Sequence, residues 1–192
     1  MQVTLNNSFT VDEPIDRVWD FLSDPRKVAP CMPGAEILEA VSATEYKGAI
    51  KMKLGPLSVK FDGEITIEHM DPATHEIRIV GRGKDSKGTG SASMVLKGRL
   101  TALPGGGTEM TSESETTING KMAQFGSRMI QDVSKALYAQ FTAAFAERLK
   151  ADTAGRPAPA APQDNALSMG QVAGAVVKGA FNRLLGKDKE KA

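Results

Sequence analysis

The chain has 192 residues, a formal net charge of +1 and 41% hydrophobic residues, which is typical of one ordinary domain with an appended segment. This charge balance provides no basic field, so nucleic acid is not an expected partner. The first residues lack the basic and apolar regions of a signal peptide, and Cys31 is the single cysteine, so we predict a cytoplasmic protein without an internal disulfide.

The chain opens with a predicted strand followed by a predicted helix. Apolar residues alternate with polar ones at Val3, Leu5, Phe9 and Val11. The helix is expected to begin at Pro14, where a missing N–H costs nothing, with Asp12 or Glu13 serving its first turn. Its buried stripe comprises Ile15, Val18, Trp19 and Leu22. Asp24 and Pro25 are expected to end it.

Six further alternating runs predict an antiparallel meander. They cover residues 37–41, 46–54, 57–70, 76–83, 91–103 and 108–119, separated by turn residues such as those at 55–56 and 71–72. Within these runs, charged residues such as Lys51 and Glu64 alternate with apolar ones such as Phe61. One face of the sheet is therefore wet and the other dry, and the dry face must be covered.

A long helix over residues 121–150 is expected to cover the dry face. Its apolar stripe comprises Met122, Phe125, Gly126, Met129, Ile130, Val133, Leu137, Phe141 and Phe145. A helix of about 45 Å laid across a curved sheet makes an α+β helix-grip fold. The space between helix and sheet is then either a packed core or an apolar cavity.

Small and flexible residues on the dry face favour the cavity. Glycines at positions such as 63, 81, 83 and 98 leave volume, and methionine adapts its shape to a ligand. The same glycines can instead bend the sheet, and methionine also fills plain cores, so both interpretations stay open. The residues expected to line the cavity are Trp19, Ile50, Met52, Phe61, Ile65, Ile79, Met94, Met110, Met122, Phe125, Met129 and Val133.

The segments after the predicted domain, residues 1–152, differ from it in composition. Residues 153–166 form a Pro/Ala-rich linker that favours an extended tether of roughly 40 Å. Residues 167–186 are amphipathic on a helical period, and 187–192 form a charged tip. Residues 167–186 are too weakly apolar to span a bilayer, so we predict that they lie on a membrane surface. Their expected membrane contacts are Val176, Val177, Phe181, Leu184, Lys178 and Arg183. Binding a partner protein, docking on the domain or disorder are alternatives, the last two favoured by the four glycines of this segment.

Catalytic chemistry is not expected from these residues. His69 is the best titratable candidate on the dry parity, but it lies at a strand end beside a turn, where a solvated histidine is commoner. Cys31 has neither a second thiol nor a neighbouring histidine for a metal site or a nucleophile. The sequence contains no phosphate loop or nucleotide fingerprint. We therefore predict a protein that is not an enzyme and has no intrinsic cofactor or metal.

Four runs resemble the G-subunit family of carbon monoxide dehydrogenase. They are DPRKVAPCMPGAE (24–36), KMKLGPLSVKFDGEI (51–65), GTGSASMVLKGRL (88–100) and GKMAQFGSRMI (120–130). The family belongs to the START-like, or SRPBCC, helix-grip superfamily, so the resemblance implies the same fold over about the first 150 residues. Its members are encoded beside molybdenum hydroxylases such as aerobic carbon monoxide dehydrogenase. The resemblance therefore implies a membrane-recruiting or maturation role for such an enzyme.

Together, the residues and the resemblance lead to one functional hypothesis. The protein recruits the hydroxylase to the inner face of the cytoplasmic membrane and carries an isoprenoid quinone in its cavity as electron acceptor. A membrane adaptor with a packed core and an assembly chaperone are the alternatives. In all three, residues 25–34 and 120–128 are expected docking surfaces, where Arg26, Lys27 and Lys121 could face an acidic partner.

Overall fold

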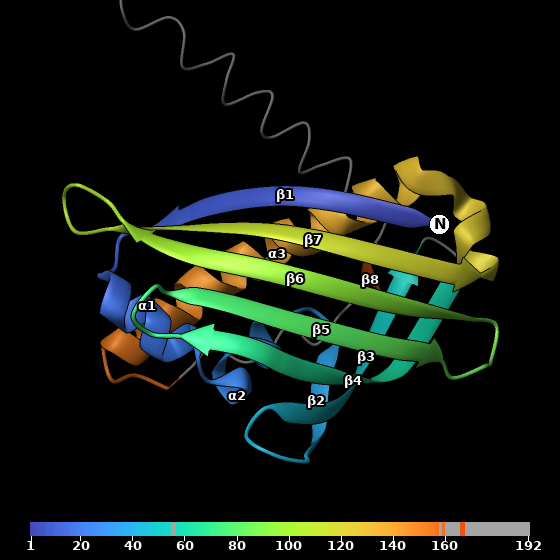
Figure 1. The fold of residues 1–192 in the computed structure, drawn as a ribbon, viewed down its shortest axis with the longest axis horizontal. Helices are drawn as coiled ribbons and strands as arrows, with labels where there is room; N and C mark the ends of the chain where they lie inside the picture. Colours follow the sequence, from blue (N-terminus) through green and yellow to red (C-terminus); the bar gives the residue numbers. More distant parts are fainter. Residues whose placement is uncertain (55–56, 158, 160–165, 168–192) are drawn as a thin grey trace, which may run out of the picture.

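The structure, a computed structural model, describes residues 1–54, 57–157, 159 and 166–167. A curved antiparallel sheet holds a long helix on its concave side (Figure 1). The strands are β1 (Gln2–Val11), β2 (Ala35–Ala40), β3 (Glu45–Leu54), β4 (Leu57–Asp71), β5 (Glu76–Asp85), β6 (Gly90–Ala102), β7 (Thr108–Gly120) and β8 (Ala166–Leu167). The helices are α1 (Ile15–Leu22), α2 (Pro25–Val28) and α3 (Gly126–Thr153), with 3₁₀ turns at Ala29–Cys31 and Lys121–Phe125.

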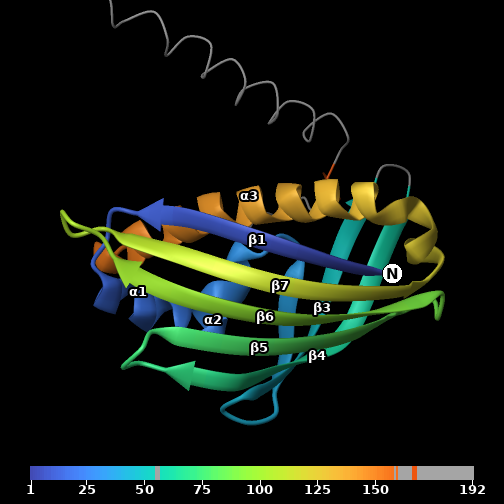
Figure 2. The same cartoon turned by 45° about the horizontal axis from the view of Figure 1, so that its top comes forward.

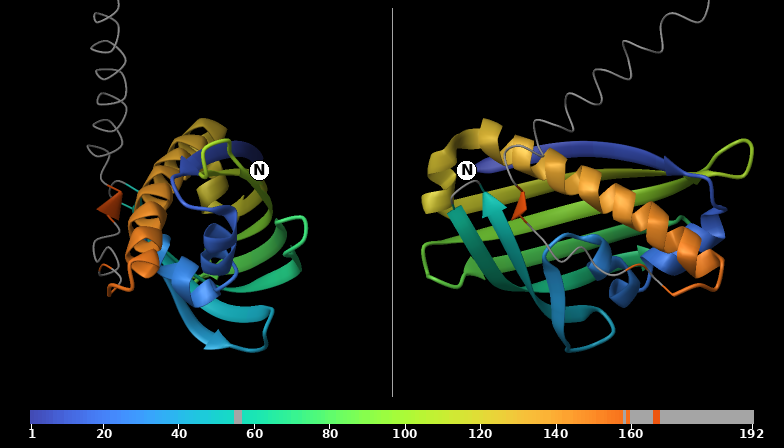
Figure 3. Two further views of the ribbon diagram at one scale, coloured as in Figure 1. Left: turned by 90° about the vertical axis from the view of Figure 1, so that its left-hand side faces the viewer. Right: turned by 180° about the vertical axis from the view of Figure 1, so that it is seen from behind.

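The strand order is β1-β7-β6-β5-β4-β3-β2, and each neighbouring pair is antiparallel. The short strand β8 pairs in parallel with Lys53 and Leu54 of β3. The sheet curls partly around α3, which also lies beside β1 (Figures 2 and 3). This arrangement confirms the predicted helix-grip fold, because every predicted strand and both predicted helices are present within a few residues of their expected bounds.

The two faces of the sheet differ as the alternation predicts. Arg78 pairs with Glu68, and Arg99 pairs with Glu76, on the convex side. These ion pairs are exposed, and such pairs stabilise a fold by only about 0–1 kcal/mol each. Apolar side chains such as Phe61 point to the concave side, where α3 covers them. Burial of this face provides the main driving force for the fold.

A bulge in β4 overturns the expected position of His69. Ile67 is paired with Ile79, but His69 is paired with Arg78, so β4 carries one extra residue at this point. One extra residue reverses the face of every side chain that follows it. His69 is therefore exposed on the convex face, and Met70 packs into the concave core in its place. The expectation that His69 shares the dry face is wrong.

Two glycines leave no room for a side chain because a neighbouring strand lies too close. A Cβ on Gly63 would collide with the carbonyl oxygen of Arg82, and one on Gly48 would lie 2.7 Å from that of Glu36. Both distances are far below normal contact, so the neighbouring backbones approach this closely only because these residues are glycine. At these two positions the glycine serves the close approach of adjacent strands and leaves no volume for a cavity.

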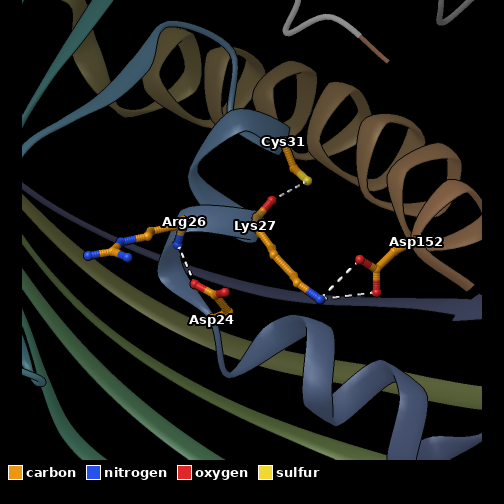
Figure 4. A network of polar contacts seen from close by, with 5 residues as sticks. All are labelled: Asp24, Arg26, Lys27, Cys31 and Asp152. Atoms are coloured by element: carbon orange, nitrogen blue, oxygen red, sulfur yellow. Dashed lines mark hydrogen bonds and ion pairs between the residues drawn. The ribbon is translucent and has the colours of Figure 1, made fainter. Parts of the chain in front are cut away.

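Residues 25–31 of the expected docking surface 25–34 fold into α2 and a 3₁₀ turn. Asp24 caps α2 by accepting a hydrogen bond of 2.9 Å from the Arg26 N–H (Figure 4). Lys27 Nζ lies 3.0 Å from Asp152 Oδ1 and thereby joins α2 to the end of α3. Cys31 is fully buried, and burial raises the pKa of its thiol to about 11, against a smaller lowering effect of Arg148. Lys27 is therefore paired within the domain, whereas the side chain of Arg26 is exposed.

Two expectations about helix starts are also corrected. The N-cap of α1 is Pro14, and neither Asp12 nor Glu13 caps the helix; the Glu13 carbonyl instead accepts a 2.7 Å hydrogen bond from Thr108 Oγ1. Gly126, expected on the apolar stripe of α3, is the first residue of that helix and has φ +80°. Only glycine adopts this conformation readily, so Gly126 turns the chain into α3 rather than leaving space in a cavity.

Candidate functional site

The concave face holds two separate apolar clusters, one at each end. The first lies where α1 meets the end of α3, and its buried members are Val11, Val18, Trp19, Phe21, Cys31, Leu100, Met110, Phe145 and Leu149. The second lies near the start of α3, and its buried members are Val3, Val59, Phe61, Ile118, Met122 and Ile130. The middle of the concave face, between these clusters, is the candidate site.

Apolar side chains in this middle region are incompletely covered. Ile65 of β4 is 42% exposed although it lies on the concave parity. Ile79, Met94 and Leu96 are half-buried and belong to neither cluster. A closed core would bury these residues, because full burial of a large apolar side chain gains about 1.5–3 kcal/mol over full exposure and these side chains realise only part of it. An incompletely covered apolar floor of this kind suits an apolar ligand.

Gly81 adds room beside this floor. It faces Met94 on β6 and Ile65 on β4. A Cβ on Gly81 would make ordinary van der Waals contact with Met94 Cε, 3.9 Å away, and no backbone atom blocks it within the described residues. Unlike Gly63, Gly81 is not required by a close approach of strands. Gly63 therefore serves the backbone of the sheet, whereas Gly81 leaves volume on the concave face.

A polar stripe runs along the same region on β7. Ser112, Ser114 and Thr116 alternate toward the concave face between the buried residues Met110 and Ile118. Ser114 is 9% exposed and is paired with Leu5 on one side and Leu96 on the other. This stripe was not predicted from the sequence. Its signal was visible in the parity of β7, where three hydroxyl-bearing residues occupy positions that an ordinary sheet core fills with apolar ones.

Tyr138 on α3 faces this stripe. Its ring packs edge-on against Phe9, with centroids 6.0 Å apart, and lies 6.4 Å from the ring of Phe141. Its Oη is buried and lacks a hydrogen-bond partner among the described residues. Burial raises the pKa of Tyr138, and the Ser112 hydroxyl nearby lowers it by less without reaching hydrogen-bonding geometry. Tyr138 is thus a protonated donor at neutral pH with no acceptor among the residues that the structure describes.

The twelve residues expected to line a cavity divide into three groups. Ile65, Ile79 and Met94 form part of the incompletely covered floor. Trp19 and Met110 are buried in the first cluster, which fits the packed-core alternative for these two. The remaining six described ones are buried in the second cluster or pack against it: Ile50, Met52, Phe61, Met122, Met129 and Val133. The side chain of Phe125 lies outside the described residues.

The convex face carries a hollow of about 710 Å³ that has a different character. It is open and lies among charged side chains that pair with one another, including Arg99 with Glu76 and Lys97 with Glu113. His69 also lines it. Mutually neutralised, solvated charges provide little binding energy for an apolar ligand. We therefore place the candidate ligand site on the concave side.

The first part of the linker turns back onto the domain. After α3, the Arg156 N–H donates to the Ala151 carbonyl at 2.9 Å, with Gly155 between them at φ +62°. Arg148, which is 8% exposed, donates from Nη2 to the Pro159 carbonyl at 2.7 Å. Among the described linker residues, Arg156 and Pro159 are therefore hydrogen-bonded to the end of α3. The expected membrane contacts at residues 176–184 lie outside the described residues.

Two further features concern the part of the chain that the structure describes. Its helices include none with both the length and the apolar character to cross a bilayer. Its His, Cys, Asp and Glu side chains form no group of three or more that could hold a metal ion.

Solved structures share this fold at low sequence identity. A conserved protein from Geobacillus kaustophilus is 23% identical with a TM-score of 0.71, covering 77% of this chain and 95% of its own. The Zhui aromatase/cyclase from Streptomyces sp. R1128 is 16% identical with a TM-score of 0.60, covering 82% and 100%. Ara h 8.0201 is 16% identical with a TM-score of 0.54, covering 79% and 99%. At these identities the similarity shows the fold alone.

At the level of sequence, one family model matches the chain. It describes the G subunit of carbon monoxide dehydrogenase (CoxG), and the match covers residues 8–150. The matched range runs from the end of β1 through most of α3 and includes β2 to β7. No curated protein sequence matches the chain.

Proposed function

The chain belongs to the CoxG family of carbon monoxide dehydrogenase, and from this premise we propose that it is a non-catalytic accessory protein of a molybdenum hydroxylase of that type. In this proposal it recruits the enzyme to the inner face of the cytoplasmic membrane and holds an isoprenoid quinone as electron acceptor. The hydroxylase supplies the redox chemistry, and this chain binds and orients the ligand.

The incompletely covered apolar floor on the concave face is the observation that carries the ligand-binding part. Ile65, Ile79 and Met94 offer apolar contact, and Gly81 leaves room beside them. A prenyl chain matches such a surface because each buried CH₂ group gains about 0.8 kcal/mol relative to water. Transfer from a bilayer gains far less, so the carrier must take the quinone up reversibly. Reversible uptake is what delivery to an enzyme requires.

A quinone suits the partner named by the family. An enzyme that oxidises its substrate needs an electron acceptor, and a respiratory quinone is dissolved in the bilayer. The C-terminal segment, residues 167–186, is the part of the chain proposed to meet that bilayer, through an amphipathic face and an excess of lysine and arginine. The domain therefore provides the ligand site, and the tail provides the location, peripheral to the membrane on the cytoplasmic side.

Non-catalytic action is part of the proposal. Some proteins of this fold are named as cyclases or synthases, such as the Zhui aromatase/cyclase, but their identity to this chain is too low to transfer an activity. The one histidine that the sequence placed on the concave face, His69, lies on the convex side. The concave face offers hydroxyl groups and apolar side chains, which bind better than they transfer protons.

Organic extraction and mass spectrometry test the proposal directly. The full chain is purified without detergent from a quinone-producing host, and the extract is analysed for prenylated quinones. A stoichiometric quinone supports the carrier. An empty protein that also takes up no quinone from liposomes contradicts it and favours a membrane adaptor with a packed core. A variant ending at residue 166 then tests recruitment: retained ligand binding with lost membrane association separates the roles of domain and tail.

A further inference from the structure

We propose that Tyr138, together with the hydroxyl groups of Ser112 and Ser114, forms a polar subsite that hydrogen-bonds an oxygen of the ligand's ring. The ligand class is an apolar molecule with a carbonyl or hydroxyl group at one end. This inference rests on the proposed quinone-carrier function and adds to it the position and orientation of the head group.

The hydroxyl group of Tyr138 has no role in the packing of the domain. Its Oη is buried without a hydrogen bond among the described residues, a state that costs about 1–3 kcal/mol and is rare in folded proteins. A phenylalanine at this position would keep the edge-on packing against Phe9 and the contact with Phe141 without that cost. The hydroxyl therefore does not serve the packing of α3 on β1, and a ligand oxygen supplies a reason for its presence.

The hydroxyl groups on β7 are spaced to suit a ring. Ser112 is paired with Asn7 of β1 and Gly98 of β6, and Ser114 lies one concave position further along β7. Successive concave positions on a strand are about 7 Å apart, which is the span of a six-membered ring with its substituents. A hydroxyl group both donates and accepts. The same groups can thus donate to a quinone carbonyl or accept from a quinol hydroxyl.

The floor beside the stripe sets the orientation. In register, Ser114 is followed across the sheet by Leu96, Ile79 and Ile67, and Thr116 is followed by Met94, Gly81 and Ile65. The polar end of this surface lies at β7 and α3, and its exposed apolar end lies at Ile65. A ligand bound here places its ring oxygen at Tyr138 and its chain toward Ile65. Because Oη has no contact with solvent, entry of the ring must displace a neighbouring side chain.

Two probes and one isosteric variant test this subsite. Decylubiquinone carries ring oxygens, and decylbenzene has the same chain without them. Binding of both to the full chain is measured by calorimetry for the wild type, Tyr138→Phe and Tyr46→Phe. Tyr46 is the matched control, because its hydroxyl already donates to the Ala43 carbonyl at 2.9 Å.

We expect Tyr138→Phe to weaken decylubiquinone binding about tenfold, equivalent to about 1.4 kcal/mol, and to leave decylbenzene binding unchanged; Tyr46→Phe should bind both probes like the wild type. The Tm of ligand-free Tyr138→Phe should equal or exceed that of the wild type, since a buried unpaired hydroxyl is removed. Ser112→Ala should weaken decylubiquinone binding in the same selective way, which provides a second variant if Tyr138→Phe fails to fold.

Three results overturn the subsite, and they differ from failure of the carrier function. If Tyr138→Phe and Ser112→Ala bind decylubiquinone as tightly as the wild type, the proposed hydrogen bond to the ring is contradicted, but the quinone-carrier function is still supported. If the wild type binds decylubiquinone and decylbenzene equally well, the ring oxygens contribute nothing to binding. If Tyr138→Phe loses the same affinity for both probes, Tyr138 contributes through packing alone. A wild-type protein that binds neither probe removes the carrier function and the subsite together.

Discussion

Gly81 and Met94 face each other across β5 and β6 on the concave side of the sheet, where a Cβ on Gly81 would meet Met94 Cε at 3.9 Å. The space between them belongs to the incompletely covered floor. We therefore predict that Gly81→Leu fills this space and lowers quinone uptake at least tenfold without unfolding the domain. Calorimetry with decylubiquinone measures the loss. Val80→Leu, which adds bulk on the opposite face of the same strand, is the control and should bind normally; normal binding by Gly81→Leu would move the site elsewhere.

Gly63 is predicted to respond to substitution in the opposite way. A Cβ at this position meets the Arg82 carbonyl oxygen and lies 2.8 Å from Gly83 Cα, and backbone atoms cannot move aside as a flexible side chain can. Gly63→Ala should lower the free energy of unfolding by about 1–3 kcal/mol or more. Gly81→Ala should leave it unchanged or raise it by up to about 1 kcal/mol. Urea unfolding measures the free energy of unfolding of both variants. Equal values for Gly63→Ala and Gly81→Ala would contradict the assigned roles of the two glycines.

Cys31 should make stability depend on alkaline pH. Burial raises the pKa of its thiol from 9.0 to about 11 in the folded protein. Between pH 9 and 11 the unfolded chain has lost this proton and the folded chain keeps it, so stability falls as pH rises through that window. Below pH 9 both states are protonated and the group has no effect. Cys31→Ala should show a smaller decrease in Tm from pH 9 to 11.

The same burial predicts a chemically inert thiol. At pH 8 a thiol with a pKa of about 11 is ionised in only about one molecule in a thousand. Iodoacetamide should therefore modify Cys31 slowly in the native protein and rapidly in urea. Fast modification of the folded protein would show that the contact between α3 and the 3₁₀ turn that carries Cys31 opens readily in solution.

Arg148 is predicted to hold the linker on the domain. Its guanidinium donates to the Pro159 carbonyl at 2.7 Å, and β8 then pairs with Lys53 and Leu54. Arg148→Met keeps the packing of the side-chain stem but removes every donor. We expect faster hydrogen exchange in the peptide covering residues 51–54. Lys150→Met, an exposed change of the same kind on α3, is the control; equal exchange in wild type and Arg148→Met would leave β8 pairing independent of Arg148.

Local patterns in the sequence were sufficient to predict the elements of the fold. Period-two alternation is a property of neighbouring residues, so the strands and the wet and dry faces were predicted correctly without knowledge of their partners. The stripe of α3 from Ile130 to Phe145 was predicted for the same reason. Family membership also followed from the sequence, because its four runs are contiguous and keep their order.

Features that depend on how strands meet were decided only by the tertiary structure. The bulge after Ile67 moved His69 to the convex face, because an extra residue is visible only against the partner strand. Gly63 and Gly81 are the same residue type on predicted strands, so the sequence does not distinguish them. The backbone of the neighbouring strand fills the space beside Gly63 but not beside Gly81. Tyr138 lies far along the chain from Ser112, and only the packing of α3 on the sheet shows that its hydroxyl lacks a hydrogen-bond partner among the described residues. Residue types and their periods thus determined the fold, and contacts between distant segments determined the candidate site.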